Sequence, residues 1–189
     1  MTDDTEKEKD SILIVDDDPS HLSVLSYFLQ RAGFTIMLAY SGESALEQAN
    51  DTQPDIILLD VMMPGLGGFE TCRRLKENEK TKDIPVIFLT ALSQTIDKVK
   101  GLELGAVDYI TKPLQSEEVL ARITTHLSVV KLQKKLQERN KRLQEENIRR
   151  TRVMEALKES RSRYRLLAEN SNDMISRQTL DNIYLYVSP

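Results

Sequence analysis

The chain has 189 residues, 40% hydrophobic and 30% charged, a composition that predicts one globular domain of ordinary size with a polar appendage. Its single cysteine, Cys72, excludes an internal disulfide and predicts a reducing compartment, the cytoplasm. No run of about 18 apolar residues occurs and the polar residues 2–10 are unlike a signal peptide, so we expect no membrane anchor.

Charge is distributed unevenly along the chain. Residues 1–130 carry 12 basic and 22 acidic side chains, residues 131–165 carry 13 and 5, and residues 166–189 carry 1 and 3. Since these segments differ in kind, the sequence predicts a domain boundary near residue 130.

Five short, mainly apolar runs predict the strands of a sheet that is buried on both faces. They are residues 12–15, 34–39, 56–59, 86–89 and 107–110. Helix signals separate these runs. Pro19 and Gly33 suit the start and end of the first helix, Ser41 caps a second, and Ser93 caps one that ends before Gly105. Alternating strands and helices predict an α/β fold with a five-stranded, doubly wound parallel sheet.

A long helix is expected after the last strand, because no Pro or Gly occurs between Ser116 and Pro189. Up to about residue 168 this helix would be roughly 80 Å long at about 1.5 Å per residue. Its first turns should pack on the sheet through Leu120, Ile123, Leu127 and Val130.

Beyond those turns, two columns of residues recur at seven-residue intervals. One column holds Val129, Leu136, Leu143, Arg150 and Leu157, and its companion holds Asn140, Asn147, Met154 and Arg161. An exposed apolar stripe of this length needs a second copy, so we expect a parallel coiled-coil homodimer, in which buried Asn favours two strands. After about Ala168 the helical pattern ends, and residues 183–187 predict a β-strand.

Chemically useful side chains follow four of the predicted strands. Asp16 and Asp17 follow the first, Asp60 the third, Thr90 the fourth and Lys112 the fifth. The carboxyl ends of parallel strands share one edge, where ligands bind. Three carboxylates brought together repel one another unless a cation enters, and Mg²⁺ prefers oxygen ligands.

One carboxylate at this edge could attack phosphorus and form an acyl phosphate, while Thr90 and Lys112 bind the remaining phosphoryl oxygens. Taken singly, each of these residues is an ordinary capping or surface residue, and only their joint occurrence at four strand ends favours a site. His21 and His126 lack metal-ligand spacing and are interpreted as surface or helix-packing residues.

Four motifs in this order and spacing resemble the receiver domain of two-component response regulators, a flavodoxin-like fold, over residues 11–128. They are Ile-Leu-Ile-Val-Asp-Asp-Asp-Pro (12–19), Leu-Asp-Val-Met-Met-Pro-Gly (59–65), Leu-Thr-Ala (89–91) and Asp-Tyr-Ile-Thr-Lys-Pro (108–113). One departure is Gly67, which stands where the family commonly has Asp.

The resemblance implies that Asp60 is the phosphoacceptor and that Thr90 and Lys112 contact the phosphoryl group. Mg²⁺ would be held by the side chains of Asp16, Asp17 and Asp60 and by the backbone carbonyl of Met62. Tyr109 would change rotamer with Thr90, and the Lys112–Pro113 bond would be cis. The phosphoryl donor would be a sensor histidine kinase or a phosphotransfer protein.

The resemblance also divides the chain. We expect a disordered tail (1–10), the receiver domain (11–128), a coiled-coil signalling helix (129–168) and the truncated start of a PAS-like domain (169–189). Residues 162–171 and 184–189 are similar to the opening of PAS domains. Such proteins commonly continue to a diguanylate cyclase or histidine kinase domain. Within this chain we expect no catalytic activity beyond Mg²⁺-dependent self-phosphorylation and dephosphorylation.

Three alternatives remain open at the level of sequence. Asp16-x-Asp18 resembles the nucleophile motif of haloacid-dehalogenase-like phosphatases, although Asp108 precedes Lys112 and no pair of adjacent Asp residues follows Lys112. The basic helix could bind nucleic acid, but its acidic residues are interleaved and no recognition element follows, so we do not expect a nucleic-acid partner. A receiver that binds partners without phosphorylation is the third alternative, and the complete acidic set argues against it.

Overall fold

The computed structural model describes residues 9–91, 101, 103–169, 176–178 and 184–187. The chain divides into two compact units, residues 1–132 and 133–189. Among the residues described, no helix combines the length and the apolar character needed to cross a membrane.

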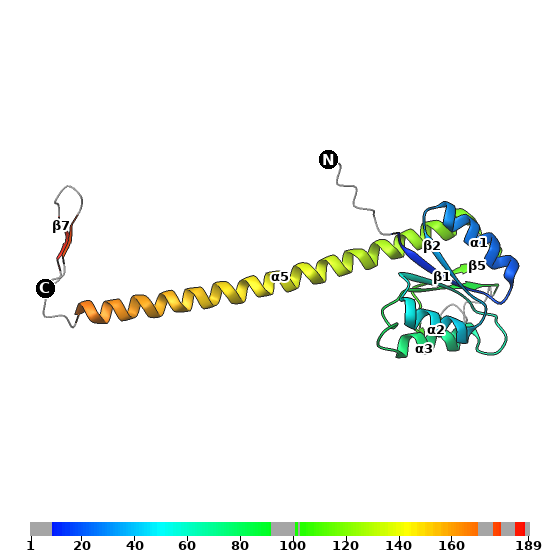
Figure 1. Cartoon of the computed structure of the whole chain (residues 1–189), viewed down its shortest axis with the longest axis horizontal. Helices are drawn as coiled ribbons and strands as arrows, with labels where there is room; N and C mark the ends of the chain where they lie inside the picture. The colour runs from blue at the N-terminus through cyan, green and yellow to red at the C-terminus, as the bar shows by residue number, and fades with distance from the viewer. Residues whose placement is uncertain (1–8, 92–100, 102, 170–175, 179–183, 188–189) are drawn as a thin grey trace. The chain divides into compact units, whose positions relative to one another are not determined.

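The first unit is built on a parallel sheet with the strand order β2-β1-β3-β4-β5, which confirms the predicted doubly wound α/β fold (Figure 1). Its strands are β1 (Ser11–Val15), β2 (Thr35–Ala39), β3 (Ile56–Asp60), β4 (Val86–Thr90) and β5 (Asp108–Thr111). Its helices are α1 (Pro19–Arg31), α2 (Gly42–Thr52), α3 (Gly68–Glu77) and the beginning of α5 (Ser116–Glu169).

Each strand contributes to two cores, because successive side chains point to opposite faces of the sheet. Leu13 and Val15 of β1 lie in a cluster with residues of α2 and α3, whereas Ile12 and Ile14 lie in a second cluster with residues of α1 and α5. Both faces are therefore covered, which is why the strands consist of nearly continuous apolar residues.

The helix ends follow the predicted signals where the structure describes them. The Asp18 side chain caps α1 by accepting a hydrogen bond from the Ser20 N–H at 2.8 Å, and Ser41 caps α2 through the Ser44 N–H at 3.2 Å. Gly33 follows α1 with φ of 100°, a conformation that glycine adopts without a Cβ clash. The helix expected after Ser93 lies outside the described residues, apart from its end near residue 101.

The first turns of α5 pack on the sheet with one shift from the predicted set. Val119, Ile123 and Leu127 are buried, whereas Leu120 and Val130 are only half-buried. The prediction was right for two of its four residues, and Val119 takes the core place expected of Leu120. From Lys131 to Leu167 the side chains of α5 are exposed.

The second unit contains residues 133–169 of α5 and two short antiparallel strands, β6 (Ser176–Gln178) and β7 (Tyr184–Val187). Strand β7 coincides with the strand that the sequence predicts over residues 183–187.

Candidate functional site

The predicted site residues lie at the carboxyl edge of the parallel sheet, where backbone hydrogen bonds continue beyond the strand ends. Asp16 follows β1 and donates its backbone N–H to Ala39 O at 3.2 Å, and Lys112 follows β5 and donates its N–H to Thr90 O at 2.8 Å. Asp60, the last residue of β3, pairs in register with Leu89. The strand ends thus bring residues almost 100 positions apart in the sequence to one edge.

Three carboxylates meet at this edge. Asp16, Asp17 and Asp60 each offer one oxygen, and these oxygens lie within 4.8 Å of one another. Asp16 and Asp60 are almost fully buried, with 1% and 4% of their surface exposed, whereas Asp17 is exposed to solvent. The cluster is therefore a shallow site that is open on one side.

The Lys112 ammonium group bridges the two buried carboxylates. Its Nζ donates to Asp60 Oδ2 at 2.8 Å and to Asp16 Oδ2 at 2.9 Å. One ammonium group facing two carboxylates leaves this part of the site with excess negative charge.

The pKa directions of the site follow from burial and from this excess charge. Burial raises the pKa of the Asp60 carboxyl group, and the hydrogen bond from Lys112 opposes that shift only in part. Burial works to lower the pKa of Lys112, but its hydrogen bonds to Asp60 and Asp16 outweigh this effect and raise it. Both groups hold protons more strongly than usual, so the site favours added positive charge. An all-oxygen donor set with this property fits a hard divalent cation such as Mg²⁺.

The loop after Asp60 is held tightly against it. The Met62 N–H donates to Asp60 Oδ1 at 3.3 Å, while the Met62 side chain is 62% exposed. Gly68 closes the loop through its N–H to Val61 O at 3.1 Å, and a Cβ at this residue would lie 2.1 Å from the Asp60 carbonyl oxygen. Gly67 supplies no side-chain cap to α3, and the Thr71 hydroxyl instead donates to Gly67 O at 3.0 Å.

Thr90 and Tyr109 occupy neighbouring strands. Thr90 is buried at the end of β4, where it pairs in register with Thr111 of β5. Tyr109 pairs with Phe88 and is half-buried, packing against the core cluster on the α2 and α3 side of the sheet. The Lys112–Pro113 peptide bond is cis, as the resemblance implied.

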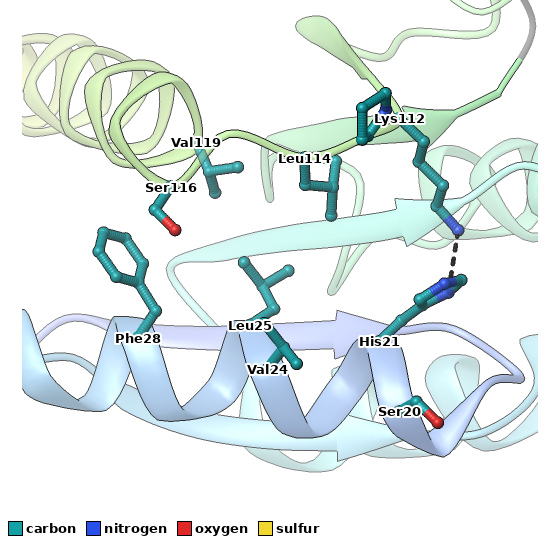
Figure 2. A pocket seen from close by; sticks show the side chains of 10 residues that line it. Ser20, His21, Val24, Leu25, Phe28, Lys112, Leu114, Ser116 and Val119 are labelled. Atoms are coloured by element: carbon teal, nitrogen blue, oxygen red, sulfur yellow. Dashed lines mark hydrogen bonds between the residues drawn. The ribbon is translucent and has the colours of Figure 1, made fainter.

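Interpreting His21 and His126 as ordinary surface or helix-packing residues was incomplete. His21 Nδ1 lies 3.4 Å from Lys112 Nζ (Figure 2) and 3.2 Å from Asp16 Oδ2, so the imidazole borders the acidic site. His126 Nε2 lies 3.1 Å from Asp108 Oδ2, beside the guanidinium of Arg122. The sequence feature that could have indicated the contact of His21 with the site is its position in the first turn of α1, five residues after Asp16.

Asp18 takes no part in the carboxylate cluster. Its side chain is committed to the α1 cap, so Asp16-x-Asp18 does not form the paired acids of a haloacid-dehalogenase-like site.

An apolar cavity of about 300 Å³ lies beside Lys112, between α1 and the segment that joins β5 to α5. Figure 2 shows Leu25 and Phe28 of α1 facing Leu114 and Val119 across it, with His21 and Lys112 at the end nearest the acidic cluster. His21 and Lys112 therefore line the cavity and also contact the carboxylates of the site.

Comparison with known proteins identifies the fold and the family. The model of the family "Response regulator receiver domain" matches residues 12–124. Over 112 residues, the chain is 47% identical to the DNA-binding dual master transcriptional regulator RpaA of Synechocystis sp. and 46% identical to the alkaline phosphatase synthesis transcriptional regulatory protein PhoP of Bacillus subtilis. Each match covers 59% of this chain and 46% of the relative, so the chain spans less than half the length of these relatives.

Solved structures match a similar share of the chain. A putative response regulator from Chloroflexus aurantiacus is 36% identical with a TM-score of 0.62, and the match covers 64% of this chain and 99% of that one. The receiver domain of a signal transduction histidine kinase from Syntrophus aciditrophicus is 38% identical with a TM-score of 0.60, and the match covers 65% of this chain and 92% of that one.

One expectation finds no support in these comparisons. We expected no nucleic-acid partner, yet one relative is named as a DNA-binding regulator. The family itself is clear, because its model covers more than half of the chain with the acidic edge in place. The chain therefore belongs to the response regulator receiver domain family.

Proposed function

We propose that Asp60 accepts a phosphoryl group from the phosphohistidine of a sensor histidine kinase or phosphotransfer protein. A carboxylate oxygen of Asp60 attacks phosphorus, the bond from phosphorus to the histidine nitrogen breaks, and the imidazole leaves with the electron pair. The observation that carries this proposal is the position of Lys112 Nζ, which contacts Asp60 and Asp16 at 2.8 and 2.9 Å. This ammonium group can stabilise negative charge on the transferred oxygens.

Asp16, Asp17, Asp60 and the backbone carbonyl of Met62 would hold Mg²⁺. When bound, the cation neutralises charge on the phosphoryl oxygens and on the crowded carboxylates. Support comes from the cluster of three carboxylates and from the raised pKa of Asp60, which both favour a cation at this position. Thr90, buried at the adjacent strand end, would donate its hydroxyl to a phosphoryl oxygen.

The same proposal assigns a switch to Thr90 and Tyr109. Contact with the phosphoryl group draws the Thr90 hydroxyl toward Asp60, and the half-buried Tyr109 ring repacks in response. Its neighbour Asp108 accepts hydrogen bonds from Arg122 Nη1 at 2.8 Å on both oxygens, which ties β5 to α5. A shift of β5 would thus reach α5 directly, and such a two-state element can transmit a signal.

Residues 129–168 would form a coiled-coil homodimer, and residues 169–189 would begin a PAS-like domain. The exposed side chains of α5 from Lys131 to Leu167 include a series of large apolar residues, and the β6–β7 pair follows the helix. In this proposal the chain, residing in the cytoplasm, controls a diguanylate cyclase or histidine kinase domain that lies outside it. The chain itself performs no chemistry beyond its own phosphorylation and dephosphorylation.

Treatment with acetyl phosphate followed by intact mass measurement tests the proposal. The protein should gain the mass of one phosphoryl group in Mg²⁺ and none in excess chelator. Asp60→Asn should abolish the gain, whereas Asp51→Asn, at an exposed position on α2, should leave it unchanged. A gain that survives Asp60→Asn, or no gain in the unaltered protein, would contradict it.

A further inference from the structure

The part of α5 in the second unit exposes a column of large side chains at seven-residue spacing. Leu136, Leu143, Leu157 and Tyr164 are between 49% and 71% exposed, and Arg150 occupies the remaining position in the column. The other described elements of this unit are two short strands of three and four residues. A column of four exposed apolar side chains and one Arg, spread over four heptad intervals, suits a coiled coil with a second copy, so this inference rests on the proposed dimer.

The two columns that flank this one differ along the helix. In the first half, the companion column holds the neutral Asn140 and Asn147, whereas the opposite flank holds the charged Arg139 and Glu146. Burying an unpaired charge costs far more than burying a neutral amide, and a core Asn is well tolerated in two-stranded coils. Residues 136–150 therefore favour the flank with Asn140 and Asn147.

In the second half, the preference reverses. The companion column now holds Met154 and the charged Arg161, whereas the opposite flank holds Val153, Ser160 and Leu167. The opposite flank is free of charge and contains two large apolar side chains, each more than 60% exposed. Residues 153–167 therefore favour the flank with Val153 and Leu167.

We propose that a second copy of this chain packs in parallel along a seam that changes flank at Arg150. The seam consists of Leu136, Asn140, Leu143, Asn147, Arg150, Val153, Leu157, Ser160, Tyr164 and Leu167. Arg150 is its single charged member, and the guanidinium already pairs with Glu146 on the same helix at 2.6 Å. An uninterrupted heptad would instead place Met154 and Arg161 against the partner.

The change of flank is a three-residue insertion in the repeat. Seam residues alternate in steps of four and three, except that two steps of three meet at Arg150. At 3.5 residues per turn this turns the contact face by about 50° around the helix axis. Such an insertion overwinds a coiled coil locally. The segment around Arg150 is then the part of the dimer where a rotation of one half relative to the other is absorbed or passed on.

Single-cysteine variants of the full chain test the seam by disulfide formation. The background is Cys72→Ala, since Cys72 is buried and its thiol pKa is raised by burial to about 11. Val153→Cys should crosslink as fast as Leu157→Cys, which lies in both possible seams. Met154→Cys should be slower by about fivefold or more, and Glu155→Cys, on the outer face, slower still, because a disulfide requires close Cβ atoms.

Dimer affinity measured by sedimentation gives a second test that leaves no cysteine in the seam. Ser160→Leu should lower the dimer dissociation constant by at least about tenfold, since it buries a leucine from each chain. Arg161→Leu should change it by less than about threefold, because Arg161 lies outside the seam.

Three results would overturn the inference. A faster crosslink at Met154→Cys than at Val153→Cys, or a larger gain from Arg161→Leu than from Ser160→Leu, would establish the uninterrupted heptad. Failure of Leu157→Cys to crosslink would remove the dimer itself. Phosphorylation of Asp60, read by intact mass, is independent of these results, so the two proposals fail separately.

Discussion

Removing the ammonium group of Lys112 should lower the free energy of unfolding of the Mg²⁺-free protein. It should also raise the affinity of the protein for Mg²⁺. In Lys112→Met, Asp16 and Asp60 stay buried at 1% and 4% exposure without their shared partner. Breaking a fully buried ion pair costs about 3–5 kcal/mol. Because the site opens to solvent at Asp17 and the Lys112 side chain is 19% exposed, we expect a loss of about 2–3 kcal/mol at neutral pH.

The gain in Mg²⁺ affinity follows from the short distance between the Lys112 ammonium group and the expected position of the cation. Lys112 Nζ lies 2.8 Å from Asp60 Oδ2, and a cation about 2.1 Å from that oxygen is within about 5 Å of the ammonium nitrogen. At that distance a unit charge and a dication repel by about 1.7 kcal/mol even at the dielectric constant of water. The variant should therefore bind Mg²⁺ about tenfold more tightly or better, since about 1.4 kcal/mol corresponds to a factor of ten.

Urea unfolding with and without Mg²⁺, followed by the fluorescence of the receiver tyrosines, measures both effects. Mg²⁺ at a hundredfold excess over its dissociation constant adds about 2.7 kcal/mol, so it should recover most of the loss in Lys112→Met. Lys82→Met, which removes an exposed ammonium paired with Glu79, serves as the control and should change stability little. The reasoning is refuted if one and the same Mg²⁺ concentration stabilises Lys112→Met no more than the unaltered protein.

Three further predictions concern residues around the site. Gly68→Ala should lower the free energy of unfolding in urea by about 1–3 kcal/mol and should make phosphorylation slower, because the added Cβ would lie 2.1 Å from the Asp60 carbonyl oxygen. Unchanged stability would contradict the close approach. Asp108→Asn should cost about 1–2 kcal/mol at pH 7, because hydrogen bonds from Arg122 and His126 outweigh burial and lower the Asp108 pKa. A carboxyl group with a lowered pKa stabilises the fold at pH values above the usual pKa of Asp, and this stabilisation is lost as the pH falls through the pKa of the folded state. The stability difference between Asp108→Asn and the unaltered protein should therefore shrink below about pH 4, and a difference independent of pH would contradict a lowered Asp108 pKa. Met62→Gln should shorten the lifetime of the phosphorylated form, because an amide beside Asp60 can orient the attacking water, which the apolar Met62 side chain cannot. Intact mass measured over time gives this lifetime, and an equal lifetime in the two proteins would count against the prediction.

The fold was predictable because its elements carry strong local signals. Runs such as Ile56–Leu59 lack alternation, which is typical of strands covered on both faces, and Ser41 marks a helix start that the structure reproduces. Strand order did not follow from local pattern. The position of β1 between β2 and β3 depends on how the crossovers pack, and this involves residues far apart in the sequence.

The gathering of the predicted carboxylates and Lys112 at one edge of the sheet was predictable from the sequence, but several of the contacts between them were not. The positions of Asp16, Asp60 and Lys112 after strands imply a shared edge once the sheet is parallel. The sequence does not reveal that Lys112 bridges both carboxylates, because a long flexible side chain can reach many partners. The contact of His21 with Asp16 likewise depends on how α1 is set against the end of β1. The shift from Leu120 to Val119 in the core reflects the rotation of α5, which tertiary packing decides.

Locating the phosphoryl group on the chain tests the central claim most directly. After treatment with acetyl phosphate and Mg²⁺, borohydride reduction converts an aspartyl phosphate into homoserine, and peptide mass mapping then identifies the residue. Homoserine should appear at position 60 in the unaltered protein and should be absent when a chelator replaces Mg²⁺. Homoserine at another acidic residue, or none in a protein that retains its fold, would contradict the assignment of Asp60 as phosphoacceptor.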